Sequence, residues 1–175
     1  MSWQKIDLEG DGPRGFDSRY ESTQNSATIF FLGSNHWWDW GHHVWFGAAK
    51  REIAAARKTI SKLTEDFGGE LPPSIHVGGH SLGGSVAESM ASILVEEMGY
   101  SEDQVSCYTF GSKRPPRGYQ YNRTQRIFHV DDLVPYLPPW RPAIAPDLYI
   151  GSGTYRFWNA HKPSEYKEVM KRTGF

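Results

Sequence analysis

Residues 74–90 read SIHVGGHSLGGSVAESM, and this stretch decides the fold because four glycines surround one serine. The run SIHVG predicts a strand, and the apolar period from Leu82 to Met98 predicts a helix. Three interpretations of the turn between them are open: a phosphate-binding loop, a plain tight turn, or a strained turn that presents a nucleophile. The other residues of the chain decide among them.

A phosphate-binding loop of the Walker type requires Gly-Lys-Ser/Thr at its end, so that a lysine and a hydroxyl reach the phosphates and magnesium. Within residues 77–87 the basic candidate is His80, which precedes the serine, and the G-x-G-x-x-G dinucleotide pattern is absent. A plain turn needs one glycine rather than four. The sequence therefore favours the strained turn.

Residues 79–83 form the G-x-S-x-G pattern of a nucleophile elbow, in the strand-to-helix context that this elbow requires. A serine in so sharp a turn needs neighbours without side chains two residues away on each side, and Gly79 and Gly83 meet that need. Gly84 allows the helix to approach the sheet closely. Ser81 then lies at the positive end of the helix, where backbone N–H groups favour developing negative charge. The pattern predicts Ser81 as a nucleophile, with His80 as a packing or hydrogen-bonding residue of the turn.

Strands and helices are expected to alternate over the rest of the chain. A hairpin should end in a buried strand at Ala27–Gly33, and apolar spacings of three and four predict a helix from Phe46 to Phe67. The other expected elements are strands at 104–110, 125–130 and around 147–158, and a helix at 164–172 capped by Ser164. This order predicts one α/β domain over residues 1–175, with a mostly parallel sheet, helices on both faces and an extended N-terminal arm to about Gly15.

The composition excludes several classes of protein. A net charge of −1 gives no electrostatic footprint for nucleic acid, and the single cysteine, Cys107, rules out an internal disulfide and suits a buried core position. No apolar run approaches the roughly 20 residues that span a bilayer, and the N-terminus has no apolar signal region. We therefore expect a cytoplasmic protein, with release by a non-signal route as the alternative.

A serine nucleophile needs a base, and the base needs an orienting carboxylate. In α/β-hydrolase chains these follow in the order Ser, acid, His, so the downstream histidines are the candidates for the base. His129 falls inside an expected strand and precedes the best acids, whereas His161 follows the last strand. The acid candidates are Asp131, Asp132 and Asp147.

The segments GHSLGG (79–84), YTFGSKR (108–114), RIFHVDDLVPYLPP (126–139) and AHKPSEY (160–166) together resemble the class 3 lipases, the family that contains the fungal triacylglycerol lipases. The resemblance covers roughly residues 16–170. It implies an α/β-hydrolase fold and a Ser81, Asp132, His161 triad. Asp132 is favoured over its neighbour because Leu-Val-Pro follows it directly, and His161 precedes a tyrosine, Tyr166, as in the family.

The same resemblance implies an oxyanion hole made by the backbone N–H groups of Ser34 and Leu82. The chain departs from the family pattern at Leu32, where family members usually carry arginine. It is also shorter than the family norm, chiefly between Trp40 and Phe46, where five residues stand in place of a longer lid region. We therefore expect a minimal lid and a preference for short- or medium-chain acyl esters.

The loop SNHWWDWGHHVW (34–45) admits further interpretations. Its tryptophans, which include Trp37, Trp38 and Trp40, either belong to the core or form an exposed apolar lip that contacts substrate; polar residues between them favour the lip. The loop's polar residues admit a metal cluster, which we disfavour because their spacing defines no tetrahedral site with supporting hydrogen bonds. These residues are His36, Asp39, His42 and His43.

We therefore expect a lipase or esterase that forms an acyl-enzyme, with no cofactor and no metal, a small-molecule ester or lipid as substrate, and transient contact with a lipid surface. Phospholipase or acyltransferase activity would use the same triad. The alternative of another class is a non-catalytic module that binds lipid or a partner through the tryptophan loop.

Overall fold

The computed structural model describes residues 4–6, 18–33, 48–153 and 157–175. These residues form a seven-stranded sheet in which the strands follow one another in chain order. The strands are β1 (Gln4–Ile6), β2 (Ser18–Ser22), β3 (Ser26–Phe31), β4 (Ser74–His80), β5 (Val105–Phe110), β6 (Thr124–His129) and β7 (Leu148–Ile150). The first three pair antiparallel, and every pair from β3 to β7 is parallel.

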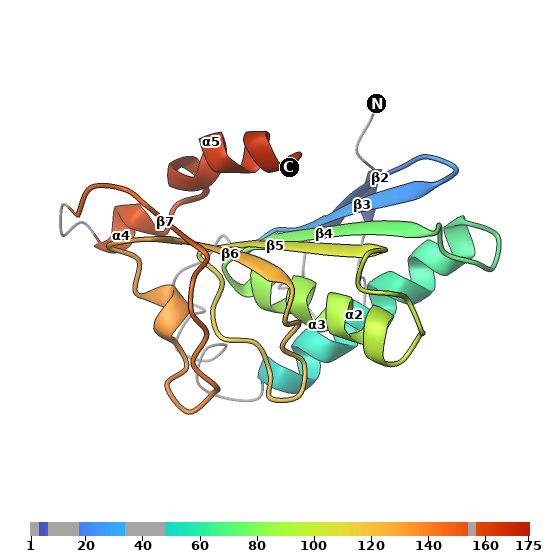
Figure 1. Ribbon diagram of the computed structural model, residues 1–175, viewed down its shortest axis with the longest axis horizontal. Helices are drawn as coiled ribbons and strands as arrows, with labels where there is room; N and C mark the ends of the chain where they lie inside the picture. Colours follow the sequence, from blue (N-terminus) through green and yellow to red (C-terminus); the bar gives the residue numbers. More distant parts are fainter. Residues whose placement is uncertain (1–3, 7–17, 34–47, 154–156) are drawn as a thin grey trace.

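Helices cover both faces of this sheet, as the sequence predicts (Figure 1). The crossover helices α2 (Ala48–Asp66) and α3 (Leu82–Glu96) lie on one face, and α5 (Pro163–Thr173) lies on the other. Successive right-handed crossovers that move along a sheet in one direction place their helices on the same side. Among the described residues, the helix on the second face comes after β7, where α5 follows the short helix α4 (Phe157–Ala160).

The core is correspondingly divided into two layers. Alternation in β3 turns Ile29 toward α2 and α3, where it joins a cluster with Val77 and Met90. On the opposite face Phe30 packs with Phe110 in a smaller cluster that α5 completes. Cys107 is buried in the first cluster, in agreement with its expected core position.

Several boundaries differ from expectation, each for a local reason. The strand expected around 147–158 ends at Ile150, because Gly151 and Gly153 take positive φ angles of 89° and 68°. Ser164 is not the cap of the last helix: Lys162 precedes α5, and Pro163 occupies its first position, where its fixed φ suits a helix start. The short strand expected at 74–78 extends through His80.

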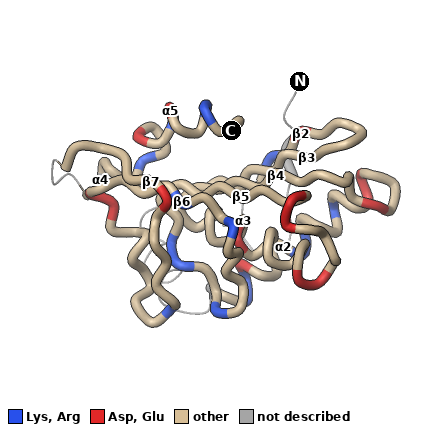
Figure 2. Tube along the Cα trace, viewed as in Figure 1, with Lys and Arg blue, Asp and Glu red and all other residues tan. Residues whose placement is uncertain are grey.

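At the N-terminus, Gln4–Ile6 pair with β2 at the edge of the sheet; the other residues of the expected arm lie outside the described part. Basic and acidic residues are interspersed along the described chain rather than separated onto opposite sides (Figure 2). None of the described helices is both long and apolar enough to cross a membrane.

Candidate active site

Ser81 stands alone between the end of β4 and the start of α3, in the turn that the glycine-rich stretch predicts. Its backbone has φ 59° and ψ −124°. Among the described residues, Ser81 is the only one other than glycine that has a positive φ. A hydrogen bond of 3.0 Å from the Ser81 N–H to the carbonyl oxygen of Phe110 holds this conformation against β5. Residues that have a side chain rarely adopt such backbone angles. The conformation is therefore strained and needs support from the surrounding structure.

The glycines around Ser81 supply that support, because each lies where no side chain would fit. A Cβ atom at Gly79 would lie 2.3 Å from the carbonyl oxygen of Gly83, and one at Gly83 would lie 2.3 Å from that of Phe31. A Cβ atom at Gly84 would come within 2.5 Å of the side chain of Ser112. The contacts at Gly79 and Gly83 agree with the steric reason for which the sequence singled them out.

The carboxylate of Asp132 lies just beyond the end of β6 and is buried, with 1% of the residue exposed. Its Oδ1 accepts a 2.9 Å hydrogen bond from the Val134 N–H. Its Oδ2 faces Gly111, where a Cβ atom would lie only 2.6 Å away and where φ is 54°. Gly111 is thus required both by its backbone conformation and by the space that the carboxylate needs.

His161, in the turn between α4 and α5, joins the serine to this carboxylate. Its Nδ1 lies 2.7 Å from Asp132 Oδ2, and its Nε2 lies 2.7 Å from Ser81 Oγ. A carboxylate accepts hydrogen bonds, so Nδ1 carries the proton, and Nε2 is left to accept the serine hydroxyl. The three side chains form a continuous hydrogen-bonded chain in which the histidine can take up the serine proton.

Tyr166 in α5 extends this hydrogen-bonded chain, and the sequence alone did not predict its contact with Asp132. Its hydroxyl donates a 2.7 Å hydrogen bond to Asp132 Oδ2 and accepts one of 3.0 Å from the His129 N–H. Burial and the Asp132 charge raise the pKa of Tyr166 above its usual value, so the hydroxyl stays protonated and remains a donor. The signal available in the sequence was the spacing of this tyrosine five residues after His161.

The other acid candidates lie elsewhere in the structure. The Asp147 carboxylate accepts a 2.7 Å hydrogen bond from the Arg126 N–H before β7 begins. Asp131 is buried beside Asp132, and its N–H donates to the ring of His129 over 3.2 Å. Asp132 is the acid candidate whose carboxylate lies within hydrogen-bond distance of the His161 imidazole.

Leu82 is the first residue of α3, so its N–H is one of those that have no acceptor inside the helix. Gly33, the last described residue before Ser34, lies against Ser81: a Cβ atom there would be 2.9 Å from Ser81 Cβ. Ser34, the tryptophans at 37, 38 and 40, and the histidine and aspartate residues considered as a metal cluster lie outside the described residues. In the described part of the chain, no group of acidic, histidine or cysteine side chains is arranged to hold a metal ion.

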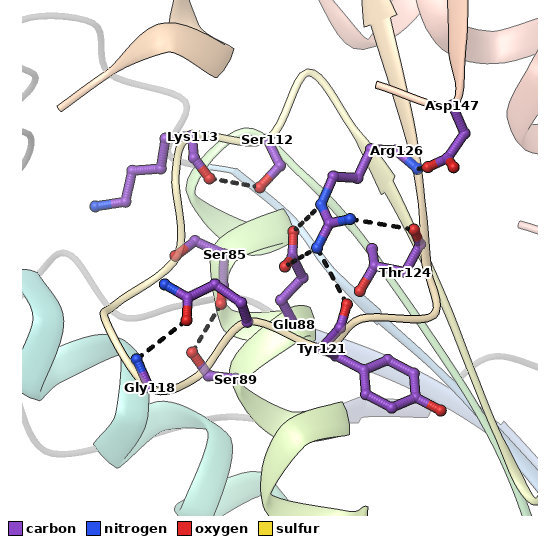
Figure 3. A network of polar contacts seen from close by, with 11 residues as sticks. Ser85, Glu88, Ser89, Ser112, Lys113, Gly118, Tyr121, Thr124, Arg126 and Asp147 are labelled. Carbon is purple, nitrogen blue, oxygen red and sulfur yellow. Dashed lines mark hydrogen bonds and ion pairs between the residues drawn. The ribbon is translucent and has the colours of Figure 1, made fainter. Parts of the chain in front are cut away.

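Buried ion pairs fix the helix that begins at the serine. Glu88 in α3 receives two hydrogen bonds from the Arg126 guanidinium, of 2.8 and 3.2 Å, and the same guanidinium reaches the Tyr121 carbonyl oxygen at 3.1 Å (Figure 3). One turn from the elbow, Ser85 donates to Glu52 of α2. Glu52 also pairs with Lys113 at 2.5 Å and with Arg141 at 3.0 Å. These contacts join α2, α3 and the loops after β5 and β6 beneath the site.

Comparison with solved structures identifies the fold. The chain is similar to the lipase of Rhizopus microsporus var. chinensis, with 18% sequence identity and a TM-score of 0.55 over 78% of this chain and 56% of that one. For lipase II of Rhizopus niveus the identity is 17% and the TM-score 0.58, over 87% of this chain and 68% of that one. For the triacylglyceride lipase of Rhizomucor miehei, the identity is 18% and the TM-score 0.56, over 87% of this chain and 68% of that one. The chain thus spans between just over half and two thirds of the length of these lipases.

No curated protein matched the chain in sequence. A family model described as "Lipase (class 3)" matches residues 14–141, which is most of the chain and includes the elbow, Asp132 and the strands between them. With the sheet, its helices and the family model in agreement, the chain belongs to the class 3 lipase family.

Proposed function

We propose that the protein is a serine carboxylic-ester hydrolase that works through Ser81, His161 and Asp132. The observation that carries this proposal is the hydrogen-bonded chain from Ser81 Oγ through His161 to Asp132, with 2.7 Å at each step. Membership of a lipase family supports ester hydrolysis as the class of reaction.

In the proposed mechanism, Ser81 Oγ attacks the ester carbonyl carbon while His161 Nε2 accepts its proton. Asp132 holds the imidazole in the Nδ1–H form and stabilises the positive charge that develops on it. His161 then protonates the leaving alcohol, which departs and leaves an acyl-serine. Water, deprotonated by His161, hydrolyses this intermediate and restores the serine.

The carbonyl oxygen of the ester becomes negatively charged when Ser81 attacks, so it needs hydrogen-bond donors directed at it. The Leu82 N–H at the start of α3 is the first proposed donor, and the Ser34 N–H, which lies outside the described residues, is the second. Each such donor lowers the barrier by about 3 kcal/mol. The position of Gly33 against Ser81 supports this role for the segment that follows β3.

We propose short- or medium-chain acyl esters as substrates, because only five residues separate Trp40 from Phe46 where larger family members have a longer lid region. Trp37, Trp38 and Trp40 are the proposed substrate contacts. A series of nitrophenyl esters of increasing acyl length measures this preference. A strong preference for emulsified long-chain triglyceride would overturn it.

The decisive experiment is labelling with a fluorophosphonate probe. We expect a covalent adduct on Ser81, located by peptide mass spectrometry, and no adduct in the Ser81→Ala variant. Ser74→Ala, which changes a serine at the opposite end of β4, is the control and should label normally. A folded wild-type protein that fails to label would favour the alternative of a non-catalytic binding module.

Phospholipase and acyltransferase activities would give the same adduct, since they would use the same residues. A panel of phospholipids, and of alcohols as acyl acceptors, separates them from simple ester hydrolysis. We expect water to be the preferred acceptor for the acyl-enzyme.

A further inference from the structure

His80 is a buried histidine next to the proposed nucleophile, and the mechanism above gives it no role. It is the last residue of β4 and is 5% exposed. Its ring lies between two segments that approach Ser81 from different parts of the chain. On one side is the end of β3, where a Cβ atom at Gly33 would be 3.3 Å from His80 Nδ1. On the other side is the turn that carries His161.

Two contacts join His80 to His161. The Nε2 of His80 lies 2.9 Å from the backbone carbonyl oxygen of His161, a contact between residues 81 positions apart. The two imidazole rings are stacked, with centroids 4.8 Å apart and planes 29° from parallel. Tyr166, which donates to Asp132, meets the His80 ring at its edge, with the centroids 5.6 Å apart.

The carbonyl contact determines where the His80 proton lies. A carbonyl oxygen only accepts hydrogen bonds, so Nε2 must carry the hydrogen. The titratable groups that the described residues place near this ring are His161, Asp132 and Tyr166. Burial, together with the proximity of His161, lowers the pKa of His80 to about 3, although the Asp132 charge acts in the opposite direction. His80 is therefore a neutral Nε2–H donor near neutral pH.

We propose that His80 is a positioning residue for His161: its neutral ring donates Nε2–H to the His161 carbonyl oxygen and supports one face of the proposed base. This inference rests on the proposed function, because it assigns His80 a task in the reaction of Ser81. His161 lies in a turn outside the sheet, whereas His80 is part of β4. The bond thus ties the base to the same strand that presents the nucleophile.

Neutrality matters because the base becomes charged. When His161 accepts the serine proton, its imidazolium lies against the stacked His80 ring. A charged His80 would repel it, whereas a neutral ring leaves Asp132 as the dominant charge that the imidazolium meets. Burial keeps His80 neutral and so avoids this repulsion.

The test separates the hydrogen bond from the stacked ring. His80→Phe keeps a ring but removes the donor, and His80→Gln restores a donor without the ring. The second-order rate constant for fluorophosphonate labelling is measured from pH 5 to 9, with thermal unfolding to verify the fold. His76→Phe is the matched control, because His76 lies on the same strand but is exposed and contacts Ser106.

We expect labelling of His80→Phe to be about a hundredfold slower than wild type, since misplacing a catalytic group by about 1 Å has an effect of that size. The labelling rate of His80→Gln should be within about tenfold of the wild-type rate. The labelling rate of His76→Phe should equal that of wild type. The labelling rate constant of wild type should fall at acid pH in a single protonation step, because a His80 that stays neutral adds no second step. Wild-type labelling speed in His80→Phe, or no recovery in His80→Gln, would overturn the proposal.

A measurement on the unaltered protein keeps the proposal testable if the Phe variant does not fold. Long-range ¹⁵N–¹H spectra distinguish the two neutral forms of histidine from its cation. His80 should be in the Nε2–H form from pH 5 to 8, and a cation or an Nδ1–H form would overturn the inference. Absence of labelling in wild type would instead count against the proposed function, so the two failures are distinguishable.

Discussion

Two buried polar networks contact the same helix and are built differently. At the start of α3, Ser81, His161 and Asp132 are joined by hydrogen bonds in which a proton can move from one partner to the next. In the middle of α3, Glu88 and Arg126 are joined by two hydrogen bonds between groups of opposite charge. The first network contains one carboxylate and no permanent cation, whereas the second is an ion pair.

The two networks also differ in the backbone conformation of their residues. Glu88 lies in a regular helix and Arg126 in a regular strand. The first network depends on positive φ angles at Ser81 and at Gly111, which faces Asp132. Strained backbone persists only where the surrounding structure holds it. The comparison teaches that ordinary secondary structure with paired charges anchors α3, so that the helix can support the strained residue that precedes it.

The first prediction changes Asp132 in the first network and leaves Ser81, the proposed nucleophile, in place. Asp132→Asn places an amide where His161 requires an acceptor, so the imidazole loses its Nδ1–H orientation. We expect kcat/KM for a nitrophenyl ester to fall by about 10⁴-fold. Asp147→Asn, at another aspartate whose carboxylate contacts the Arg126 backbone, should leave kcat/KM within a few-fold. Equal losses in both variants would contradict the assignment of the acid.

The second prediction breaks the anchoring network. Glu88→Gln leaves the buried Arg126 guanidinium without its counter-charge, and we expect the free energy of unfolding to fall by about 3–5 kcal/mol. Urea unfolding measures this loss, and the labelling rate per folded molecule should change little. Glu97→Gln removes the exposed ion pair with Arg57 and should cost under about 1 kcal/mol. If Glu88→Gln slows labelling of the folded protein severely, the division between anchor and reactive network is wrong.

The two networks also differ in how far the sequence predicts them. The elbow has a steric signature in Gly79 and Gly83, because a local turn constrains residues that are close in the chain. The α/β fold, its parallel sheet and its two helical layers were predicted for the same reason and are confirmed. The choice of Asp132 and His161 came from chain order and family resemblance, and their catalytic roles remain predictions.

The ion pairs were not predicted, because a charged residue in an amphipathic pattern is expected to face solvent. Glu88 is buried instead, since Arg126 reaches it from a strand 38 residues away. The role of Tyr166 as a donor to Asp132 was missed for a similar reason: no local period reveals which residue an aromatic hydroxyl will meet. Long-range pairing of polar groups is decided by the topology of the sheet.

The third prediction uses pH to test the neutral state of His80, whose ring contacts His161 of the first network. The pKa of His80 is lowered to about 3 in the folded protein, from about 6.5 when unfolded, so below pH 6.5 the unfolded state binds more protons. Stability from this residue is therefore complete above pH 6.5 and is lost as the pH falls toward 3. Between pH 6 and 4 we expect wild type to lose up to about 1.4 kcal/mol per pH unit relative to His80→Gln. Parallel stability curves from urea titrations of the two proteins would contradict the buried neutral state.

The smallest predicted effect concerns backbone strain, and its sign should reverse between Ser81 and the regular part of α3. At Ser81, whose φ is 59°, glycine relieves strain that alanine retains, so Ser81→Gly should be more stable than Ser81→Ala by about 1 kcal/mol. At Ser89, in the regular part of the helix, Ser89→Gly should be less stable than Ser89→Ala by about 1 kcal/mol. Both Ser81 variants should fail to label, and urea unfolding of the four proteins measures the two differences. If alanine were the more stable choice at both positions, the turn at Ser81 would store no strain, and anchoring of α3 would not be needed to hold Ser81 in its conformation.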